Sequence, residues 1–175
     1  MSQFVFDPLR EADLPMFREW LQRPHCAEWW GEAESMEELR EDYVRNPGTT
    51  RPYIVLLDGE RVGYIQSYVA KDSGGGWWEE VSDPGVRGID QFLADGSRLG
   101  RGLGRRMIRA FLAKIFEDPA VTYVQTDPDP DNLRAVRCYT AAGFEPVKRV
   151  VTPDGEALLM HCTRDSLTRA GRSSA

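Results

Sequence analysis

Three short stretches in the first part of the chain read as β-strands, and in the first of them apolar and polar positions alternate. The stretches cover residues 4–9, 52–57 and 61–69, and Asp58-Gly59 lies between the last two. Asp-Gly flanked by alternating apolar residues is typical of a tight hairpin turn. The pattern therefore predicts one strand at the start of the chain and a β-hairpin further along.

Helical spacing of apolar residues predicts four helices, over residues 11–22, 36–45, 103–116 and 131–142. Ser35 and Glu38 have the spacing of a capping box at the start of the second helix. Gly143 follows the last helix and is a typical residue at a helix end. We expect Pro24 to end the first helix and residues 25–31 to form a loop.

Five further extended segments are predicted, over residues 77–82, 86–94, 121–126, 144–151 and 157–162. The order β-α-α-β-β-β-β-α-β-α-β-β then predicts an α/β or mixed α+β fold. With no repeat and no linker, we expect one domain over residues 1–175. About ten residues at the C-terminus are polar and are expected to fray.

Composition restricts the class of protein. The 175 residues are 41% hydrophobic and 29% charged, as in ordinary soluble domains. No apolar run reaches the ~18 residues of a membrane span, and residues 1–7 lack the pattern of a secretory signal. Cys26, Cys138 and Cys162 are widely spaced and form no CxxC pair, which disfavours a disulfide framework or a zinc site. We expect a cytoplasmic protein with reduced thiols, no metal and no membrane contact.

Charge restricts the class of ligand. The net charge of −6 disfavours binding to nucleic acid and permits a cationic ligand. Residues 32–42 and 79–83 are acidic, whereas residues 98–109 carry five arginines. An acidic pocket beside a basic loop would suit a cationic acceptor and an anionic cofactor; solvated surface charge is the alternative.

A glycine-rich turn precedes the helix predicted at 103–116. Its sequence is Gly100-Arg101-Gly102-Leu103-Gly104-Arg105. Glycines let the backbone approach a ligand closely, and the free N–H groups of a helix start suit a phosphate. The spacing matches neither a Walker loop nor a dinucleotide fingerprint. The turn is therefore a candidate phosphate site of another kind, or a plain turn.

Two further pieces follow this turn in the order seen in a known superfamily. A strand ends in Thr126-Asp127, and the next helix contains Asn-x-x-Ala-x-x-x-Tyr-x-x-x-Gly-Phe over residues 132–144. Together with the glycine turn, residues 86–144 resemble the GNAT acetyltransferase superfamily. The resemblance implies an acyl-CoA N-acyltransferase fold, with a central, mostly antiparallel sheet flanked by helices, and acetyl-CoA as co-substrate.

The resemblance also implies how coenzyme A would be bound. In the superfamily, amides of the glycine turn hold the pyrophosphate, while the Asn side chain and the tyrosine helix line the pantetheine arm. Leu99 stands where the family usually has Gln or Arg, so the backbone amides would carry this contact. The cofactor-binding residues expected on this basis are Phe92, Leu93, Arg101, Gly102, Leu103, Gly104, Arg105, Asn132 and Ala135.

Longer stretches resemble the aminoglycoside 6′-N-acetyltransferases in particular. They include Glu28-Trp29-Trp30-Gly31, residues 64–68, residues 76–80, residues 83–91 and Gln125-Thr126-Asp127-Pro128. This resemblance extends over residues 6–160 and implies acetylation of the 6′-amine of aminoglycosides, giving antibiotic resistance. The segment between Trp30 and Tyr43 looks shorter than in those enzymes, so antibiotic preference stays open.

The chemistry of amide formation assigns roles to two side chains. An alkylammonium must lose a proton before it attacks a thioester, and Asp90 is the candidate base; the resemblance places the matching residue beside the 6′-amine. The resemblance assigns protonation of the leaving thiolate to Tyr139, and a phenol of pKa ~10 can donate to a thiolate of pKa ~8.5. The superfamily would supply an oxyanion donor from the backbone near Phe92 or Leu93. The alternatives are an Asp90–Arg87 pair and a core tyrosine.

Carboxylates and aromatic faces suit the ammonium and hydroxyl groups of an aminoglycoside. The expected acceptor-binding residues are Trp30, Tyr43, Gln66, Trp78, Glu79, Asp90 and Asp127. A GNAT enzyme for another amine, such as a hydroxylysine siderophore precursor or a protein N-terminus, is a second hypothesis, and a non-catalytic acetyl-CoA sensor is a third. The paired tryptophans before acidic residues favour the first. Either a monomer or a homodimer is compatible with the sequence.

Overall fold

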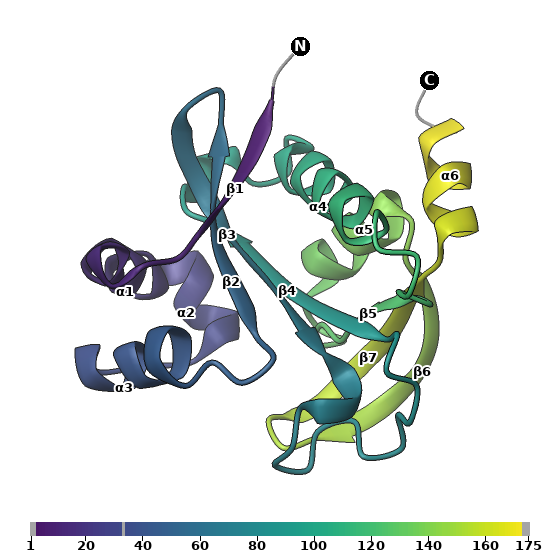
Figure 1. Ribbon diagram of the computed structural model, residues 1–175. Coiled ribbons are helices and arrows are strands. Elements are labelled where there is room, and N and C mark those ends of the chain that lie inside the picture. Colours follow the sequence, from purple (N-terminus) through teal and green to yellow (C-terminus); the bar gives the residue numbers. More distant parts are fainter. Residues whose placement is uncertain (1–2, 33, 173–175) are drawn as a thin grey trace. The chain divides into compact units, whose positions relative to one another are not determined.

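The computed structural model describes residues 3–32 and 34–172, which fall into two compact units (Figure 1). The N-terminal unit comprises Met1–Ser67 and Gln91–Leu99, and the C-terminal unit comprises Tyr68–Asp90 and Gly100–Ala175. The sequence predicts no secretory signal in residues 1–7. Two of these residues, Met1 and Ser2, lie outside the described residues. None of the helices in the described part of the chain is long and apolar enough to cross a membrane.

The strands of the N-terminal unit begin with an antiparallel set. β1 (Phe4–Pro8) pairs with β2 (Arg51–Leu57), and β2 pairs with β3 (Glu60–Val69). Asp58 and Gly59 connect β2 and β3 with positive φ angles of 51° and 86°, as a type I′ hairpin turn requires. The predicted first strand and hairpin are confirmed. The end of β4 (Arg87–Leu93) completes the unit's strand order β1-β2-β3-β4.

Helices of the N-terminal unit enclose an aromatic core. A 3-10 turn (Glu11–Asp13) leads into α1 (Leu14–Leu21), which is followed by α2 (Pro24–Trp30) and α3 (Met36–Arg40). A π-helical turn (Glu41–Arg45) extends α3. The rings of Tyr64 and Phe92 lie 5.4 Å apart, and that of Phe17 lies 4.6 Å from Tyr64. The strands are thus joined to the helices mainly through aromatic contacts.

The predicted loop at residues 25–31 is wrong, because this segment forms α2. Pro24 occupies the first turn of α2, where its missing N–H removes no helical hydrogen bond. Gly31 ends the helix with a φ of 77°. Cys26 on α2 is fully buried. Proline therefore ends the preceding helix and starts the next.

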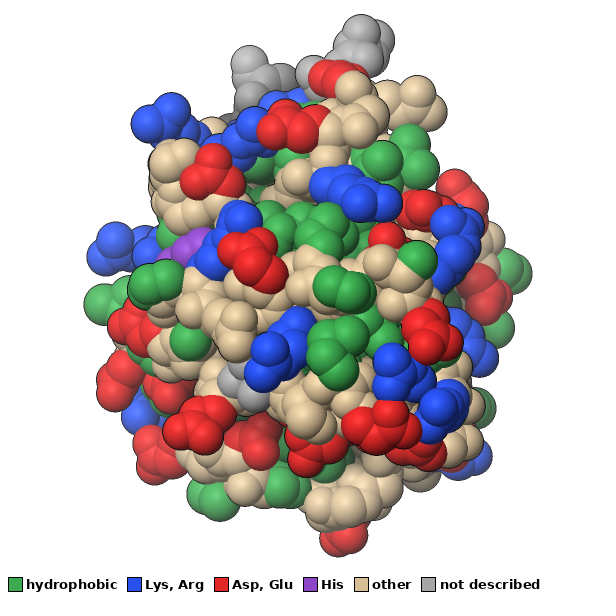
Figure 2. All heavy atoms as spheres, turned by 90° about the vertical axis from the view of Figure 1, so that its left-hand side faces the viewer, with side chains coloured by type: hydrophobic (Ala, Val, Ile, Leu, Met, Phe, Trp, Pro, Cys, Tyr) green, Lys and Arg blue, Asp and Glu red, His purple; other side chains and the backbone are tan. Residues whose placement is uncertain are grey.

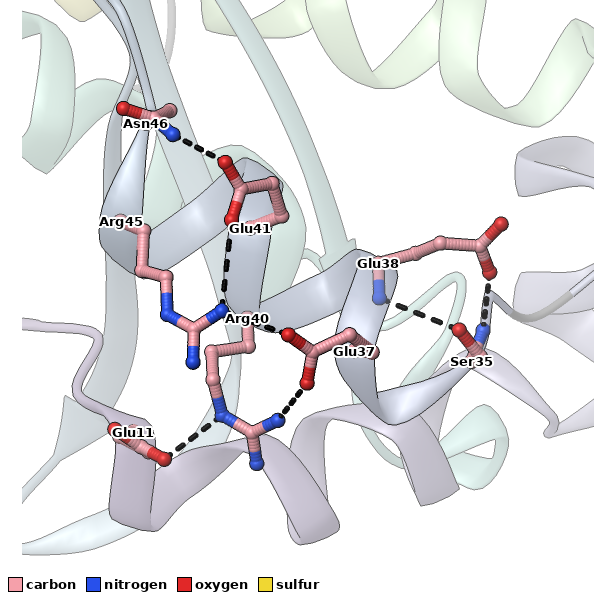
Figure 3. Close-up of polar contacts among 8 residues, drawn as sticks. All are labelled: Glu11, Ser35, Glu37, Glu38, Arg40, Glu41, Arg45 and Asn46. Atoms are coloured by element: carbon pink, nitrogen blue, oxygen red, sulfur yellow. Dashed lines mark hydrogen bonds and ion pairs between the residues drawn. The ribbon is translucent and has the colours of Figure 1, made fainter.

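Surface charges in the N-terminal unit are arranged in pairs. Figure 2 shows acidic and basic side chains interspersed over one face, and Figure 3 shows a group of such pairs around α3. Glu37 accepts hydrogen bonds from Arg40 and Arg45, and Arg40 also donates to Glu11. At the start of α3, Ser35 and Glu38 form the predicted capping box, which is confirmed. Because the pairs are largely exposed, each contributes little to stability.

The strands of the C-terminal unit follow the order β4-β5-β7-β6, and the unit also includes the last two residues of β3, Tyr68 and Val69. β4 is parallel to β5 (Val124–Thr126), which is antiparallel to β7 (Gly155–Cys162), and β7 is antiparallel to β6 (Glu145–Thr152). The two strands predicted last along the chain are confirmed. β5 is shorter than the predicted 121–126. The predicted mixed, mostly antiparallel arrangement is confirmed.

The α-helices in the described residues of the C-terminal unit are α4 (Leu103–Ile115), α5 (Leu133–Ala142) and α6 (Arg164–Arg172), and a 3-10 turn covers Ala70–Asp72. The apolar face of α4 is buried, and α4 packs against α5. Gly143 ends α5 with a φ of 119°. The helices predicted in these regions are confirmed, with α5 beginning two residues after the predicted start at 131.

Two predictions for the C-terminal unit are wrong. Residues 77–82 form turns and not a strand, because three glycines at 74–76, all with positive φ, reverse the chain. The polar tail is helical as far as Arg172, because Thr163 and Ser166 bond reciprocally at the start of α6 and Arg169 pairs with Glu145 at 2.9 Å. Residues 173–175 of the predicted frayed tail lie outside the described residues.

Candidate functional site

The glycine turn before α4 has the backbone geometry of an anion site. Gly100 and Gly102 have φ angles of 71° and 79°, and Gly102 is the N-cap of α4. A Cβ at either glycine would meet no atom of the described residues within 4 Å. The glycines are therefore needed for backbone conformation, and the turn leaves open space beside the first N–H groups of α4.

Residues 103 and 104 can contact a ligand only through their backbone, whereas Arg101 and Arg105 can also use their side chains. Leu103 is buried in the core, so it can offer a ligand only its backbone N–H. Gly104 likewise has only backbone groups. Arg101 is exposed and Arg105 is half-buried, and both can place positive charge near a bound anion. The turn therefore combines backbone amide donors with two arginine side chains, and such a set of groups suits an anion.

The start of α5 carries the next predicted cofactor contacts. Asn132 is the N-cap, and its side-chain oxygen accepts a hydrogen bond of 3.1 Å from the Ala135 N–H. The cap uses one of the two acceptor positions of this oxygen, and the amide nitrogen is the group of Asn132 that could donate to a ligand. Asn132 thus has a structural role in addition to any role in binding.

α5 also carries Cys138 and Tyr139. Tyr139 is 5% exposed, and its ring packs edge-on against Phe144 at 5.3 Å. Burial raises the pKa of the Cys138 thiol to about 11, partly opposed by Arg105. Cys138 is therefore protonated at neutral pH and is a poor nucleophile.

Two carboxylates extend from the same end of β4 and β5. The parallel register pairs Gly88 with Gln125, and Asp90 and Asp127 each follow two residues later. Burial, and then the charges of Asp90 and Asp154, raise the pKa of Asp127 to about 8. An ammonium ion placed between the two carboxylates would lower this pKa and favour the charged form.

Tyr68 completes this acidic group and was missed in the sequence. Its hydroxyl accepts a hydrogen bond of 3.1 Å from the indole nitrogen of Trp78. Its ring lies against Gly88, where a Cβ would be 2.0 Å from the Tyr68 Cζ atom. Burial, and then the charges of Asp90 and Asp127, raise the pKa of Tyr68 well above its usual value. The hydroxyl therefore stays protonated beside the carboxylates.

Buried polar groups continue on the same face of the sheet. Gln125 is fully buried, and its amide atoms have no hydrogen-bond partner of good geometry among the described residues. Its side chain is nevertheless close enough to the Tyr68 hydroxyl to lower the pKa of Tyr68 against the larger effect of burial. His161 pairs with Gln125 in register and stacks on Tyr123 at 4.3 Å. Buried amides are normally paired, so this group suits a bound water or a polar ligand.

The predicted acceptor residues fall into both units. Trp78 belongs to the C-terminal unit, where it is 5% exposed and packs with Ala70, Val86 and Leu159; the neighbouring Glu79 is exposed. This unit therefore brings Trp78, Asp90 and Asp127 together around Tyr68. The Trp78 side chain mainly packs in the core, and its indole N–H donates to the Tyr68 hydroxyl.

The other three acceptor candidates lie in the N-terminal unit. Trp30 is half-buried and meets Tyr64 and Phe92 edge-on, at 5.8 and 5.2 Å. Tyr43 meets Phe17 at 5.1 Å. Gln66 accepts a hydrogen bond of 2.7 Å from the Tyr64 hydroxyl. These side chains share one aromatic cluster with partly exposed edges.

Phe92 and Leu93, the last predicted cofactor residues, end β4 in the N-terminal unit. Both side chains are buried, with 6% and 5% exposed, so a ligand could reach them only through the backbone.

Within residues 3–32 and 34–172, no group of three His, Cys, Asp or Glu side chains is arranged to hold a metal ion.

Comparisons with known proteins identify the family to which the chain belongs. A family model described as an acetyltransferase (GNAT) domain matches residues 10–152. The chain is 51% identical over 170 residues to an aminoglycoside N(6′)-acetyltransferase type 1 of Serratia marcescens, covering 94% of this chain and 85% of that protein.

Solved structures give the same result for the fold. A structure of AAC(6′)-Ib with coenzyme A and kanamycin is 50% identical, with a TM-score of 0.89, covering 95% of this chain and 98% of that one. A structure of AAC(6′)-Ib with paromomycin and acetyl-CoA is also 50% identical, with a TM-score of 0.90, covering 95% and 97%. The predicted acyltransferase fold is thereby confirmed.

Proposed function

The chain belongs to the GNAT acetyltransferases, and among them to the aminoglycoside N(6′)-acetyltransferases; on that premise we propose that it acetylates the 6′-amino group of aminoglycosides and so confers resistance. The observation that carries the proposal is 51% identity to a named enzyme of this activity along 94% of the chain. The co-substrate is acetyl-CoA, which relatives of the same fold bind.

The glycine turn is the proposed site of the coenzyme A pyrophosphate. The positive φ of Gly102 and the open space beside it support this assignment. The N–H groups of Gly102, Leu103 and Gly104 would donate to phosphate oxygens, and Arg101 and Arg105 would neutralise their charge. Further along the cofactor, Asn132 and Ala135 at the start of α5 would contact the pantetheine arm, as in the superfamily that the sequence resembles.

Asp90 is the proposed general base. The substrate ammonium loses a proton to the carboxylate, directly or through water, and the lone pair so freed attacks the thioester carbonyl. The nitrogen then loses its second proton to solvent as the amide forms. A backbone N–H near Phe92 or Leu93 would stabilise the oxyanion that forms. When the carbon–sulfur bond breaks, Tyr139 would give its proton to the departing thiolate. The shared end of β4 and β5, where Asp90 lies beside a second carboxylate, supports this assignment.

Asp127 is proposed to hold a further ammonium group of the acceptor. Its buried carboxyl is protonated near neutral pH in the absence of a cation, because burial raises its pKa to about 8. A neighbouring ammonium compensates that burial and stabilises the carboxylate. Trp30, Tyr43, Gln66, Trp78 and Glu79 are the remaining proposed acceptor contacts.

The experiment that tests the activity follows coenzyme A release with a thiol reagent. Kanamycin and tobramycin carry a 6′-amine, whereas paromomycin carries a hydroxyl at that position and serves as the control. We expect turnover with the first two and none with paromomycin. Equal turnover with paromomycin would contradict the 6′ position. The absence of turnover with every aminoglycoside would direct the search to a siderophore precursor or a peptide amine.

A further inference from the structure

The peptide unit between Leu93 and Ala94, at the end of β4, is held at both of its polar ends. The Leu93 carbonyl oxygen lies 2.8 Å from His25 Nε2, and the Ala94 N–H donates to the Val62 carbonyl at 3.0 Å. The next carbonyl, that of Ala94, accepts a hydrogen bond of 2.6 Å from Arg23. Two successive carbonyls at the end of β4 are thus bonded to side chains at the start of α2.

The side of β4 that faces β3 is equally constrained. A Cβ at Gly63 on β3 would lie 2.4 Å from the Phe92 carbonyl oxygen. Only glycine lets the two backbones approach this closely. The end of β4 therefore has the glycine of β3 on one side and the side chains of α2 on the other.

His25 is itself held in place. A Cβ at Gly96 would lie 3.0 Å from His25 Nδ1, so the ring fills the space that this glycine leaves. Because a carbonyl only accepts hydrogen bonds, Nε2 carries the ring proton in the contact with Leu93. The next residue, Cys26, is fully buried and anchors α2, while Arg23 is paired with Glu19.

Holding one peptide unit at both ends fixes the backbone angles on either side of it. These are ψ of Leu93 and φ of Ala94. Because the held peptide is joined through the Leu93 Cα to the preceding peptide, it also restricts where that preceding unit, which carries the Leu93 N–H, can lie. We propose that His25 is a positioning residue for acetyl transfer, which holds the Leu93–Ala94 peptide so that the backbone N–H near Phe92 and Leu93 is directed at the thioester carbonyl. This inference rests on the proposed function, because the oxyanion donor belongs to that reaction.

The test compares His25→Ala with His25→Gln by steady-state kinetics, using kanamycin and acetyl-CoA. We expect His25→Ala to lower kcat about 10- to 100-fold, because a small misplacement of a group that acts in the transition state costs rate. The Kd for coenzyme A should change less than about twofold, since the proposed pyrophosphate contacts lie at residues 100–105. His25→Gln should recover most of the rate, because its amide nitrogen can donate to the Leu93 carbonyl.

Two further variants separate positioning from folding. Gly96→Ala pushes against the other side of the His25 ring and should lower kcat in the same way. Gln22→Ala, at an exposed residue just before this segment, should leave kcat and Kd unchanged. Should His25→Ala not fold, a normal rate for His25→Gln with a reduced rate for Gly96→Ala would support the proposal.

Four results would overturn or redirect the proposal for His25. Wild-type kcat in a folded His25→Ala would exclude a positioning role, as would a normal rate in Gly96→Ala. A His25→Gln variant that is folded but as slow as His25→Ala would show that the hydrogen bond to Leu93 is not the cause. If the wild-type protein acetylates no aminoglycoside, the proposed function fails instead, and the variants are then read with the amine that it does accept.

Discussion

At the scale of single residues, the proposed reaction depends on the carboxylate of Asp90. We expect Asp90→Asn to lower kcat/KM for kanamycin by about 100-fold or more, because general base catalysis typically contributes this much. Coenzyme A should still bind with unchanged Kd, which calorimetry can measure, since its proposed contacts lie elsewhere. An unchanged turnover in Asp90→Asn would exclude this carboxylate as the base.

Asp127 should make stability depend on pH. Its pKa is about 8 in the folded chain against a usual value of 3.8, so between these values the folded protein binds more protons than the unfolded one. Stability should therefore fall as pH rises from about 4 to about 8. In urea unfolding over that range, Asp127→Asn should show a smaller fall than the wild type. An equal fall in both proteins would contradict the assignment of the shift to Asp127.

Some of these residues could be identified from the sequence and others could not. Asp90 and Asp127 lie in stretches that resemble a known enzyme family. Tyr68, however, lies in a predicted strand, and tyrosine is common in strands without any functional role. Its burial against Gly88 and its bond to Trp78 arise only when β4 and the turn after the three glycines fold over it. A glycine in the middle of a predicted strand was the one available signal of such a close approach.

At the scale of secondary structure, Gly102 links the start of α4 to the proposed cofactor site. We expect Gly102→Ala to raise the KM for acetyl-CoA, because a side chain disfavours the φ of 79° that directs the first amides. The strain should also lower stability by about 1 kcal/mol. Gly59→Ala is the matched control, since Gly59 has a φ of 86° in the β2–β3 turn. That variant should lose similar stability while keeping the KM, and a raised KM in both would show a general effect of strain.

The spacing of apolar residues predicted the longer helices and strands correctly. The prediction failed where a residue type, such as proline, is found both at the end of one element and at the start of another. α4 has an apolar face that repeats over its whole length, so its position could be predicted. Pro24 is compatible with both the end of one helix and the start of another, and the choice depends on the burial of Cys26. The sequence also predicts an extended segment over residues 77–82, which begins with two tryptophans. In the folded chain they pack onto the core from a turn.

At the scale of the whole molecule, charge should govern the encounter with a polycationic acceptor. The net charge is −6, and a field of this sign attracts a ligand that carries several ammonium groups. Salt screens such attraction, with a Debye length of about 10 Å at 0.1 M and about 3 Å at 1 M. We therefore expect kcat/KM for kanamycin to fall several-fold as salt is raised through this range, mainly through a higher KM.

The matching measurement with acetyl-CoA distinguishes this long-range attraction from a general effect of salt. Acetyl-CoA is anionic, so the net charge repels it while Arg101 and Arg105 attract it locally. These contributions oppose each other, and its KM should depend on salt less steeply than that of kanamycin. Equal slopes for the two substrates would mean that salt acts on the protein itself. A KM for kanamycin independent of salt would place acceptor recognition in hydrogen bonds and ring contacts, with little contribution from charge.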